Sequence, residues 1–205
     1  MPVVLDRVPG PLASAEAPVR SLVLDVSRLP SVLGAYGPWA VAADASPSAE
    51  AGSPSPGSGE VVTETAEPFA EGCVARLVRS VGAEQVWGEA YTDGGREEVT
   101  AHQFVLRFGS SQEAALVGGR LLAGGDCVAP SAGWVVEQQV GGVVALGVEV
   151  PVAAAEEVAV HVDGPLVAVL TVHRGGRGVW PGEGLSEPFR DAATEFLALG
   201  DSPAQ

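Results

Sequence analysis

Few side chains in this sequence belong to types that carry chemistry, and the spacing of the histidines disfavours a metal centre. His161 and His173 fall on two strands that a tight turn is expected to join. At about 3.3 Å per residue, this register would place them roughly 20 Å apart. His102 falls on a different hairpin. Because metal ligands must converge, we expect neither a metal nor another cofactor, and we expect the histidines at or near the surface.

The two cysteines leave two alternatives open. Cys127 follows Gly-Gly-Asp and is the one conceivable nucleophile, with His102 as the base that would activate it. The other interpretation pairs Cys127 with Cys73 or buries both thiols, and the number and spacing of cysteines alone do not choose between a disulfide and free thiols. The Gly-x-Ser-x-Gly elbow of serine hydrolases is absent from the sequence. We therefore expect no catalytic residues and no enzyme.

Adjacent carboxylates and glycine-rich segments do not form recognisable sites either. Glu97-Glu98 and Glu156-Glu157 are neighbours on expected strands, so the two side chains of each pair point to opposite faces. We interpret both pairs as solvated edges of the sheet. The glycine-rich segments lack the phosphate-loop pattern, and the chain has no lysine.

One loop is a candidate for binding. The segment Gly175–Gly184 carries Trp180 among glycines and a proline, and Arg174 and Arg177 lie at its start. An exposed tryptophan beside arginines would be a contact residue for a ligand. The alternatives are that Trp180 covers the core and that the arginines lie on a solvated turn.

Composition limits the classes of partner. The chain carries 11 basic and 26 acidic residues, a net charge of -15, and its bases are all arginine. Binding of nucleic acid or of an anionic membrane needs clustered positive charge, so neither is expected. The absence of lysine and asparagine indicates a GC-rich coding background, such as that of an actinobacterium. An apolar fraction of 46% is enough for a sizeable core.

Location follows from two features. The sequence has no run of 18 apolar residues and begins without the pattern of a signal peptide. The cytoplasm is therefore the default expectation, with no membrane insertion by this chain. An extracytoplasmic location is expected instead if Cys73 and Cys127 are bonded.

Periodicity predicts an α+β fold, with an antiparallel sheet of about six strands and helices packed mainly on one face. Tight turns join the strands in pairs, which makes them antiparallel. Three helices are expected near Glu67–Val81, from Ser110 to Gly124, and over Glu187–Leu199. The expected strands are Gln85–Thr92, Glu97–Phe108, Trp134–Val140, Val143–Val150, Glu157–Val162 and Leu166–His173.

The chain divides into four parts by composition. Residues 1–43 are expected to pack on the main domain, and the Ser-, Pro- and Gly-rich residues 44–65 form a flexible linker or loop. Residues 66–200 form the α+β domain, and residues 201–205 form a disordered tail.

The order of elements, with one cysteine inside the first long helix and another just past the second, resembles a known family. The chain is similar to the PknH-like extracellular sensor domains of actinobacterial Ser/Thr kinases and lipoproteins over most of residues 21–199. The chain has one cysteine pair, where that family often has two. The matching segments are Leu29–Gly34, Glu71-Gly72-Cys73, Phe104–Phe108, Ser110–Ala115, Asp126-Cys127 and Leu166–His173.

The resemblance implies a helix-covered antiparallel sheet held by disulfides, a bond between Cys73 and Cys127, and a ligand-binding role. We therefore expect a non-catalytic, sensor-like domain that binds an unidentified small molecule or protein. The alternatives are a structural or assembly protein of an envelope or phage particle, and a cysteine-dependent enzyme using Cys127.

Overall fold

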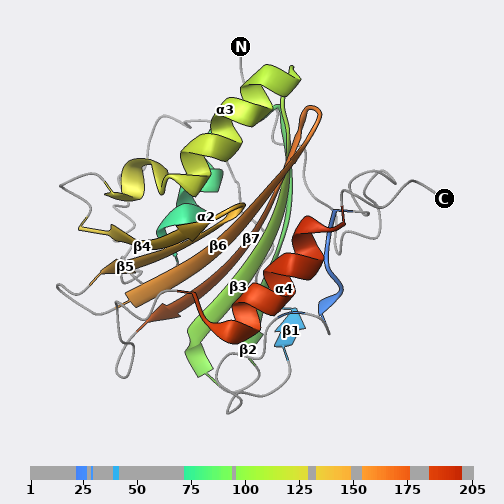
Figure 1. Ribbon diagram of the computed structural model, residues 1–205. Helices are drawn as coiled ribbons and strands as arrows, with labels where there is room; N and C mark the ends of the chain where they lie inside the picture. Colours follow the sequence, from blue (N-terminus) through green and yellow to red (C-terminus); the bar gives the residue numbers. More distant parts are fainter. Residues whose placement is uncertain are drawn as a thin grey trace, which may run out of the picture.

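The computed structural model describes residues 22–26, 29, 39–41, 72–93, 96–128, 133–148, 154–175 and 185–199. The strands among these residues form one antiparallel sheet of seven strands, in the order β1-β2-β3-β7-β6-β5-β4. Figure 1 shows β1 and β4 at the two edges and the long hairpin β6–β7 in the middle. The predicted α+β class is confirmed.

Glycine turns separate two of the strand pairs. Gly141 and Gly164 take positive φ angles of 56° and 54° in the tight turns that end β4 and β6. The three-residue strand β1, which pairs with β2, is an addition to the six strands predicted. The strands are β1 (Trp39–Val41), β2 (Gln85–Asp93), β3 (Arg96–Arg107), β4 (Val135–Val140), β5 (Val143–Val148), β6 (Ala154–Asp163) and β7 (Leu166–Gly175).

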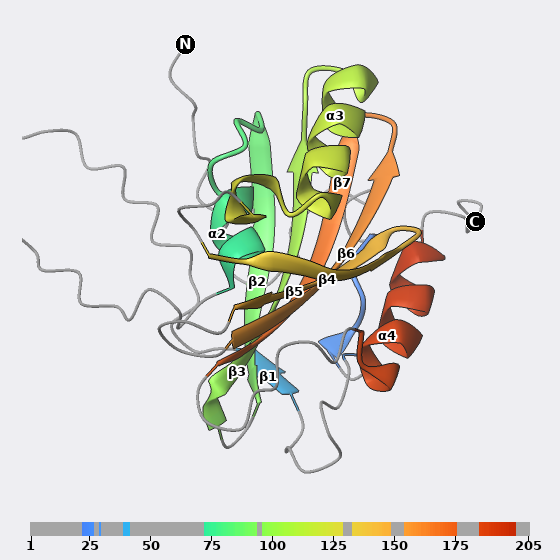
Figure 2. The ribbon, with the colours of Figure 1, turned by 60° about the vertical axis from the view of Figure 1, so that its left-hand side comes forward.

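Helices cover both faces of this sheet. The helices α2 (Cys73–Val78) and α3 (Ser111–Leu122) lie on one face, with the short 3-10 helix η4 (Gly125–Val128). The helix α4 (Glu187–Leu197) lies on the opposite face, as Figures 1 and 2 show from two sides. Two of the three described helices thus share a face, and the third covers the other.

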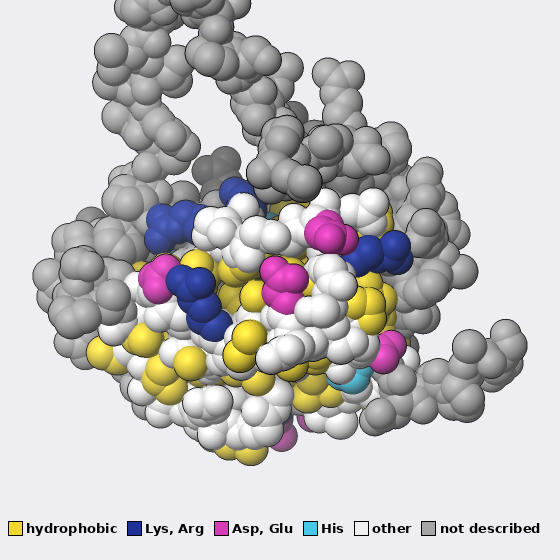
Figure 3. All heavy atoms as spheres, turned by 90° about the horizontal axis from the view of Figure 1, so that it is seen from above, with side chains coloured by type: hydrophobic (Ala, Val, Ile, Leu, Met, Phe, Trp, Pro, Cys, Tyr) yellow, Lys and Arg dark blue, Asp and Glu magenta, His cyan; other side chains and the backbone are white. Residues whose placement is uncertain are grey.

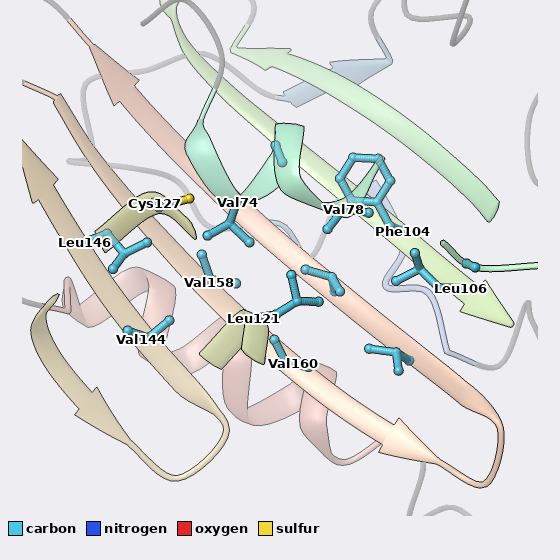
Figure 4. Packing of buried hydrophobic residues seen from close by; sticks show 14 of the residues in the cluster. Val74, Val78, Phe104, Leu106, Leu121, Cys127, Val144, Leu146, Val158 and Val160 are labelled. Carbon is cyan, nitrogen blue, oxygen red and sulfur yellow. The ribbon is translucent and has the colours of Figure 1, made fainter. Parts of the chain in front are cut away.

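The core on the α2 and α3 face is built from alternate residues of the central strands. Val158 and Val160 of β6 pack with Val74 of α2 and Leu121 of α3. Figure 4 shows these side chains converging between the helices and the sheet, with Cys127 beside them. Since β7 is covered on both faces, it reads as a nearly continuous apolar run, as a fully buried strand does, whereas Glu156 and Glu157 interrupt the apolar residues of β6.

The opposite face is covered by α4 and by part of the N-terminal region. Phe189 and Phe196 of α4 are buried against the sheet together with Leu24. The side-chain amide of Gln103 on β3 fixes that segment, because its Oε1 accepts from Leu24 N at 2.9 Å and its Nε2 donates to Leu24 O at 2.9 Å. One glutamine thus supplies the bonds that a neighbouring strand would otherwise make.

The helices α3 and α4 begin where side-chain oxygens cap them. Ser110 Oγ accepts from Glu113 N at 3.2 Å, and Ser186 Oγ accepts from Phe189 N at 3.3 Å. Both caps satisfy amides that a helix cannot pair internally. The predicted N-terminal ends at Ser110 and Ser186 are therefore confirmed.

Two glycines inside α3 differ in what surrounds them. A Cβ on Gly118 would lie 2.6 Å from Val162 Cγ2 of β6, so this glycine lets the helix approach the sheet. A Cβ on Gly119 would meet nothing within 4 Å. Glycine destabilises a helix interior by about 1 kcal/mol relative to alanine.

We therefore expect Gly119→Ala to raise the free energy of unfolding by about 1 kcal/mol. The matched variant Gly118→Ala should gain less or lose stability, because its new methyl group collides with Val162. Urea unfolding of both variants checks this. Equal gains in the two would contradict the packing of α3 on β6.

Candidate functional site

Buried polar side chains of the described residues gather on three adjacent strands at the centre of the sheet. We call this group the polar belt. On the α2 face it contains His102, Glu156, Thr171 and His173, and on the α4 face it contains Gln103, Glu157 and Arg174. Charged and polar groups are rarely buried in such numbers without partners, and perturbed ionisable groups concentrate at functional sites.

Glu156 lies on β6 and points at the beginning of α2. Its carboxylate accepts from Val74 N at 2.8 Å and from Ala75 N at 3.1 Å. These first-turn amides have no acceptor within the helix. Burial raises the pKa of Glu156 to about 7, while the hydrogen bonds from Val74 and Ala75 and the charge of Arg76 act in the opposite direction.

Glu157, the next residue, accepts hydrogen bonds from the residue that precedes α4 on the opposite face. Its carboxylate accepts from the backbone N–H of Ser186 and, at 3.1 Å, from the Ser186 hydroxyl. Arg174 of β7 lies 3.8 Å from Glu157 in an ion pair whose side chains are 9% and 1% exposed. Burial raises the pKa of Glu157, opposed by the bond from Ser186 and the charge of Arg174.

One rung of the sheet aligns a hydroxyl, an imidazole and a carboxylate. Thr100 of β3 pairs with His173 of β7, and His173 pairs with Glu156 of β6. This is the order of a nucleophile, a base and an orienting acid. However, the Glu156 carboxylate is engaged by α2, and the buried Thr100 Oγ1 has no hydrogen-bond partner in the structure. The geometry therefore lacks the bonds that activate a nucleophile.

The next rung pairs His102 with Thr171. The ring of His102 stacks on Phe104 at 5.7 Å, and the ring of Trp134 lies 6.3 Å from that of His173. Burial, together with the charges of Arg79 and His173, lowers the pKa of His102 to about 4. A histidine in this environment stays neutral at neutral pH.

Cys73 and Cys127 form a disulfide that joins the first residue of α2 to η4, with their Cα atoms 5.9 Å apart. A bonded sulfur has no thiolate, so Cys127 is not available as a nucleophile while the bond is intact. The described residues contain no group of three His, Cys, Asp or Glu side chains placed to hold a metal.

Several interpretations from the sequence were wrong. Glu156 and Glu157 point to opposite faces as expected, yet they are fully buried rather than solvated edges. His102 and His173 are also buried, at 6% and 1% exposure, rather than near the surface. The pairing of β3, β7 and β6 causes both results, because it places three separate segments at the sheet centre.

The residues singled out for ligand binding are only partly described. Arg174 lies in β7 and is buried against Glu157, so it is not on a solvated turn. Arg177 and Trp180 lie outside the described residues. The sequence did contain a signal that Glu156 and Glu157 are buried. The neighbouring residues Ala154, Ala155 and Val158 place apolar side chains on both faces of the strand, which is typical of a strand buried on both sides.

Comparisons with known proteins give one likeness. The crystal structure of the extracellular domain of PknH from Mycobacterium tuberculosis matches with a TM-score of 0.37 and 15% identity, over 57% of this chain and 63% of that chain. The likeness is compatible with the resemblance in the sequence, but at these values it carries no argument about function. No protein-family model matches this chain, and no curated protein matches it.

The described helices include none with the length and apolar character needed to cross a membrane.

The disulfide should make a measurable contribution to the free energy of unfolding. The bond closes a loop between residues 54 apart in sequence, which is worth about 4 kcal/mol in the chain-entropy account. Replacing both Cys73 and Cys127 by serine should lower the free energy of unfolding by about this amount. Protein purified without reductant should show no titratable thiol in the folded or the unfolded state. Two thiols appearing on unfolding would contradict the bond.

Proposed function

We propose that this chain is a non-catalytic, sensor-like binding domain that recognises a protein partner through its edge strand β4. The observation that carries the proposal is the exposure of Val135 (58%), Val136 (41%) and Val140 (60%) on this strand. Edge strands with exposed apolar side chains are places where other chains bind.

Charge supports an apolar contact at this edge. β4 carries a single charged side chain, Glu137, although the chain as a whole has a net charge of -15. On the face shown in Figure 3, the described basic and acidic side chains are interspersed, so this face presents no field of one sign. Three of the five exposed large apolar side chains of the described residues therefore lie on a strand with one charged residue.

The backbone of β4 limits how a partner can bind. A bulge between Val136 and Gln138 interrupts the register with β5. Bulges twist an edge and restrict continuous pairing with another strand. We therefore expect the partner to contact the valine side chains more than the backbone, and to offer an apolar surface itself.

The disulfide supports an oxidising compartment as the place of action, because such bonds persist outside the cytoplasm. A partner reached there would be an envelope or extracellular protein. A second copy of this chain at the same edge would correspond to the assembly role.

Lysine at both Val135 and Val140 should lower partner affinity by about tenfold or more, because burying one valine is worth about 1.5 kcal/mol. The control is Leu116→Lys, whose side chain is 69% exposed on α3, a helix that packs on β6 and β7. Each variant, immobilised, is incubated with an extract of the source cells, and bound proteins are identified by mass spectrometry. A partner held by wild type and control but lost from the β4 variant supports the proposal, and identical binding by all three contradicts it.

Sedimentation velocity across a range of concentrations identifies the kind of partner. Association of wild type that the β4 substitutions abolish would make the partner another copy. A monomer at every concentration leaves a different protein as the partner.

A second candidate function is binding of an anionic small molecule where β7 ends. It is favoured by Arg174, whose buried Nε has no hydrogen-bond partner in the structure although its guanidinium faces Glu157. A ligand carboxylate or phosphate could satisfy such a donor. The contacts proposed for it are Arg174, Arg177 and Trp180.

Inorganic phosphate is a suitable probe for this second site. Tryptophan fluorescence should change as phosphate is added to wild type, and the change should be lost in Arg177→Gln. Arg120→Gln, which removes an exposed charge from α3 on the opposite face of the sheet, is the matched control and should titrate like wild type. Identical titrations of all three proteins would remove the anion site.

A further inference from the structure

A short segment of the N-terminal region, residues 22–26, lies on the α4 face of the sheet, and we call it the strap. Figures 1 and 2 both show it, in blue, beside α4 and near β1. Leu22 and Leu24 are 2% and 1% exposed and belong to the same core cluster as Phe189 of α4, whereas Asp25 is exposed. The strap thus buries two leucines that are one residue apart.

A side-chain amide on β3 binds the backbone of the strap. Gln103 Oε1 accepts from Leu24 N, and Gln103 Nε2 donates to Leu24 O, both at 2.9 Å. Two bonds to one residue fix the register, because a shift by one residue would present Val23 to the amide and would move both leucines out of their places. The same bonds would form with the backbone of any peptide that presents leucines at this spacing.

The orientation of this amide is set by β2 and β3 without the strap. Tyr91 donates its hydroxyl proton to Glu89 Oε2 at 2.8 Å, so its oxygen is left to accept, and Gln103 Nε2 donates to it at 3.2 Å. Glu89 lies directly opposite Gln103 in the pairing of the two strands. The second N–H of Gln103 and its oxygen therefore stay available for the backbone of a bound segment.

Release of the strap would not leave these polar groups buried without partners. Water would reach the amide of Gln103 and the backbone of Leu24, so two hydrogen bonds would be exchanged for bonds to water at a modest net cost. The sheet would keep its own pairing, since β3 is bonded to β2 on one side and to β7 on the other. The strap is therefore separable from the strands that hold it.

We propose that the α4 face contains a binding site for a peptide segment with two leucines one residue apart, and that residues 22–26 fill this site in cis as a removable strap. Burial of the leucines supplies the affinity, and Gln103 supplies the register. The site is separate from β4, which lies at the opposite edge of the sheet from β1.

A free peptide with the sequence of residues 22–29 tests the site in trans. Its target is the full chain carrying both Leu22→Asp and Leu24→Asp, which we call the undocked variant, because charged side chains are too costly to bury in an apolar core. Fluorescence anisotropy of the labelled peptide should show saturable binding to this variant. Wild-type protein should bind it about tenfold more weakly or less, since its strap competes in cis at a high effective concentration. A peptide with aspartate in place of both leucines should not bind.

A further substitution tests the role of the amide. Gln103→Leu in the undocked variant should weaken peptide binding by about 30-fold, because two hydrogen bonds are lost. Gln112→Leu is the matched control, since Gln112 is exposed on α3 on the other face of the sheet, and it should leave the affinity unchanged. The proposal is overturned by equal binding of the peptide to wild type and undocked variant, by unchanged affinity in Gln103→Leu, or by no binding to an undocked variant whose circular dichroism shows it folded.

Hydrogen exchange on wild-type protein covers the case in which the undocked variant does not fold. Relative to its intrinsic rate, the amide of Leu24 should exchange about 100-fold faster or more than that of Val169, which lies on the central strand β7. Equal protection of the two amides would mean that the strap leaves only when the sheet unfolds, and there would be no removable strap.

Discussion

A buried carboxylate needs hydrogen-bond donors, and Glu156 finds them in the first turn of α2 while Glu157 finds them in Ser186, the residue before α4. Because neighbouring residues of a strand point to opposite faces, this one dipeptide contacts the beginnings of helices on both faces of the sheet. β6 lies between β7 and β5, where helices cover both of its faces. The disulfide then joins α2 to η4, and Arg174 balances the charge on the α4 side.

Local pattern was enough for most of the elements. Alternation and glycine turns located six strands, and serine caps at Ser110 and Ser186 located the beginnings of two helices, because these signals lie within a few residues of each other. The strand β1 was missed because three residues give no period. The stripe of α4 showed that it has a buried side, but an apolar stripe does not say which face of a sheet it covers.

The candidate site could not be assembled in the same way. The polar belt draws on β3, β6 and β7, and only the strand order brings His102, His173 and Glu156 to one face. A local rule that charged residues face water gave the wrong result for Glu156 and Glu157. Amides of α2 bond to Glu156, and Ser186 and Arg174 contact Glu157, and these partners come from distant segments. The exposed valines of β4 are a similar case, since their sequence reads like that of any half-buried strand.

The pairing of β3 with β7 joins two halves of the chain that are far apart in sequence. Both cysteines of the disulfide belong to the first half, together with β2, β3 and α3, and both precede β4. Oxidation can therefore close a covalent loop in a chain whose strands β6 and β7 have not yet been synthesised. In that species the amides of Val74 and Ala75 have no carboxylate to accept from, because β6 has not arrived. The disulfide thus holds α2 beside η4 before β6 supplies the carboxylate of Glu156. This restraint reduces the conformational search that long-range strand pairing requires during folding.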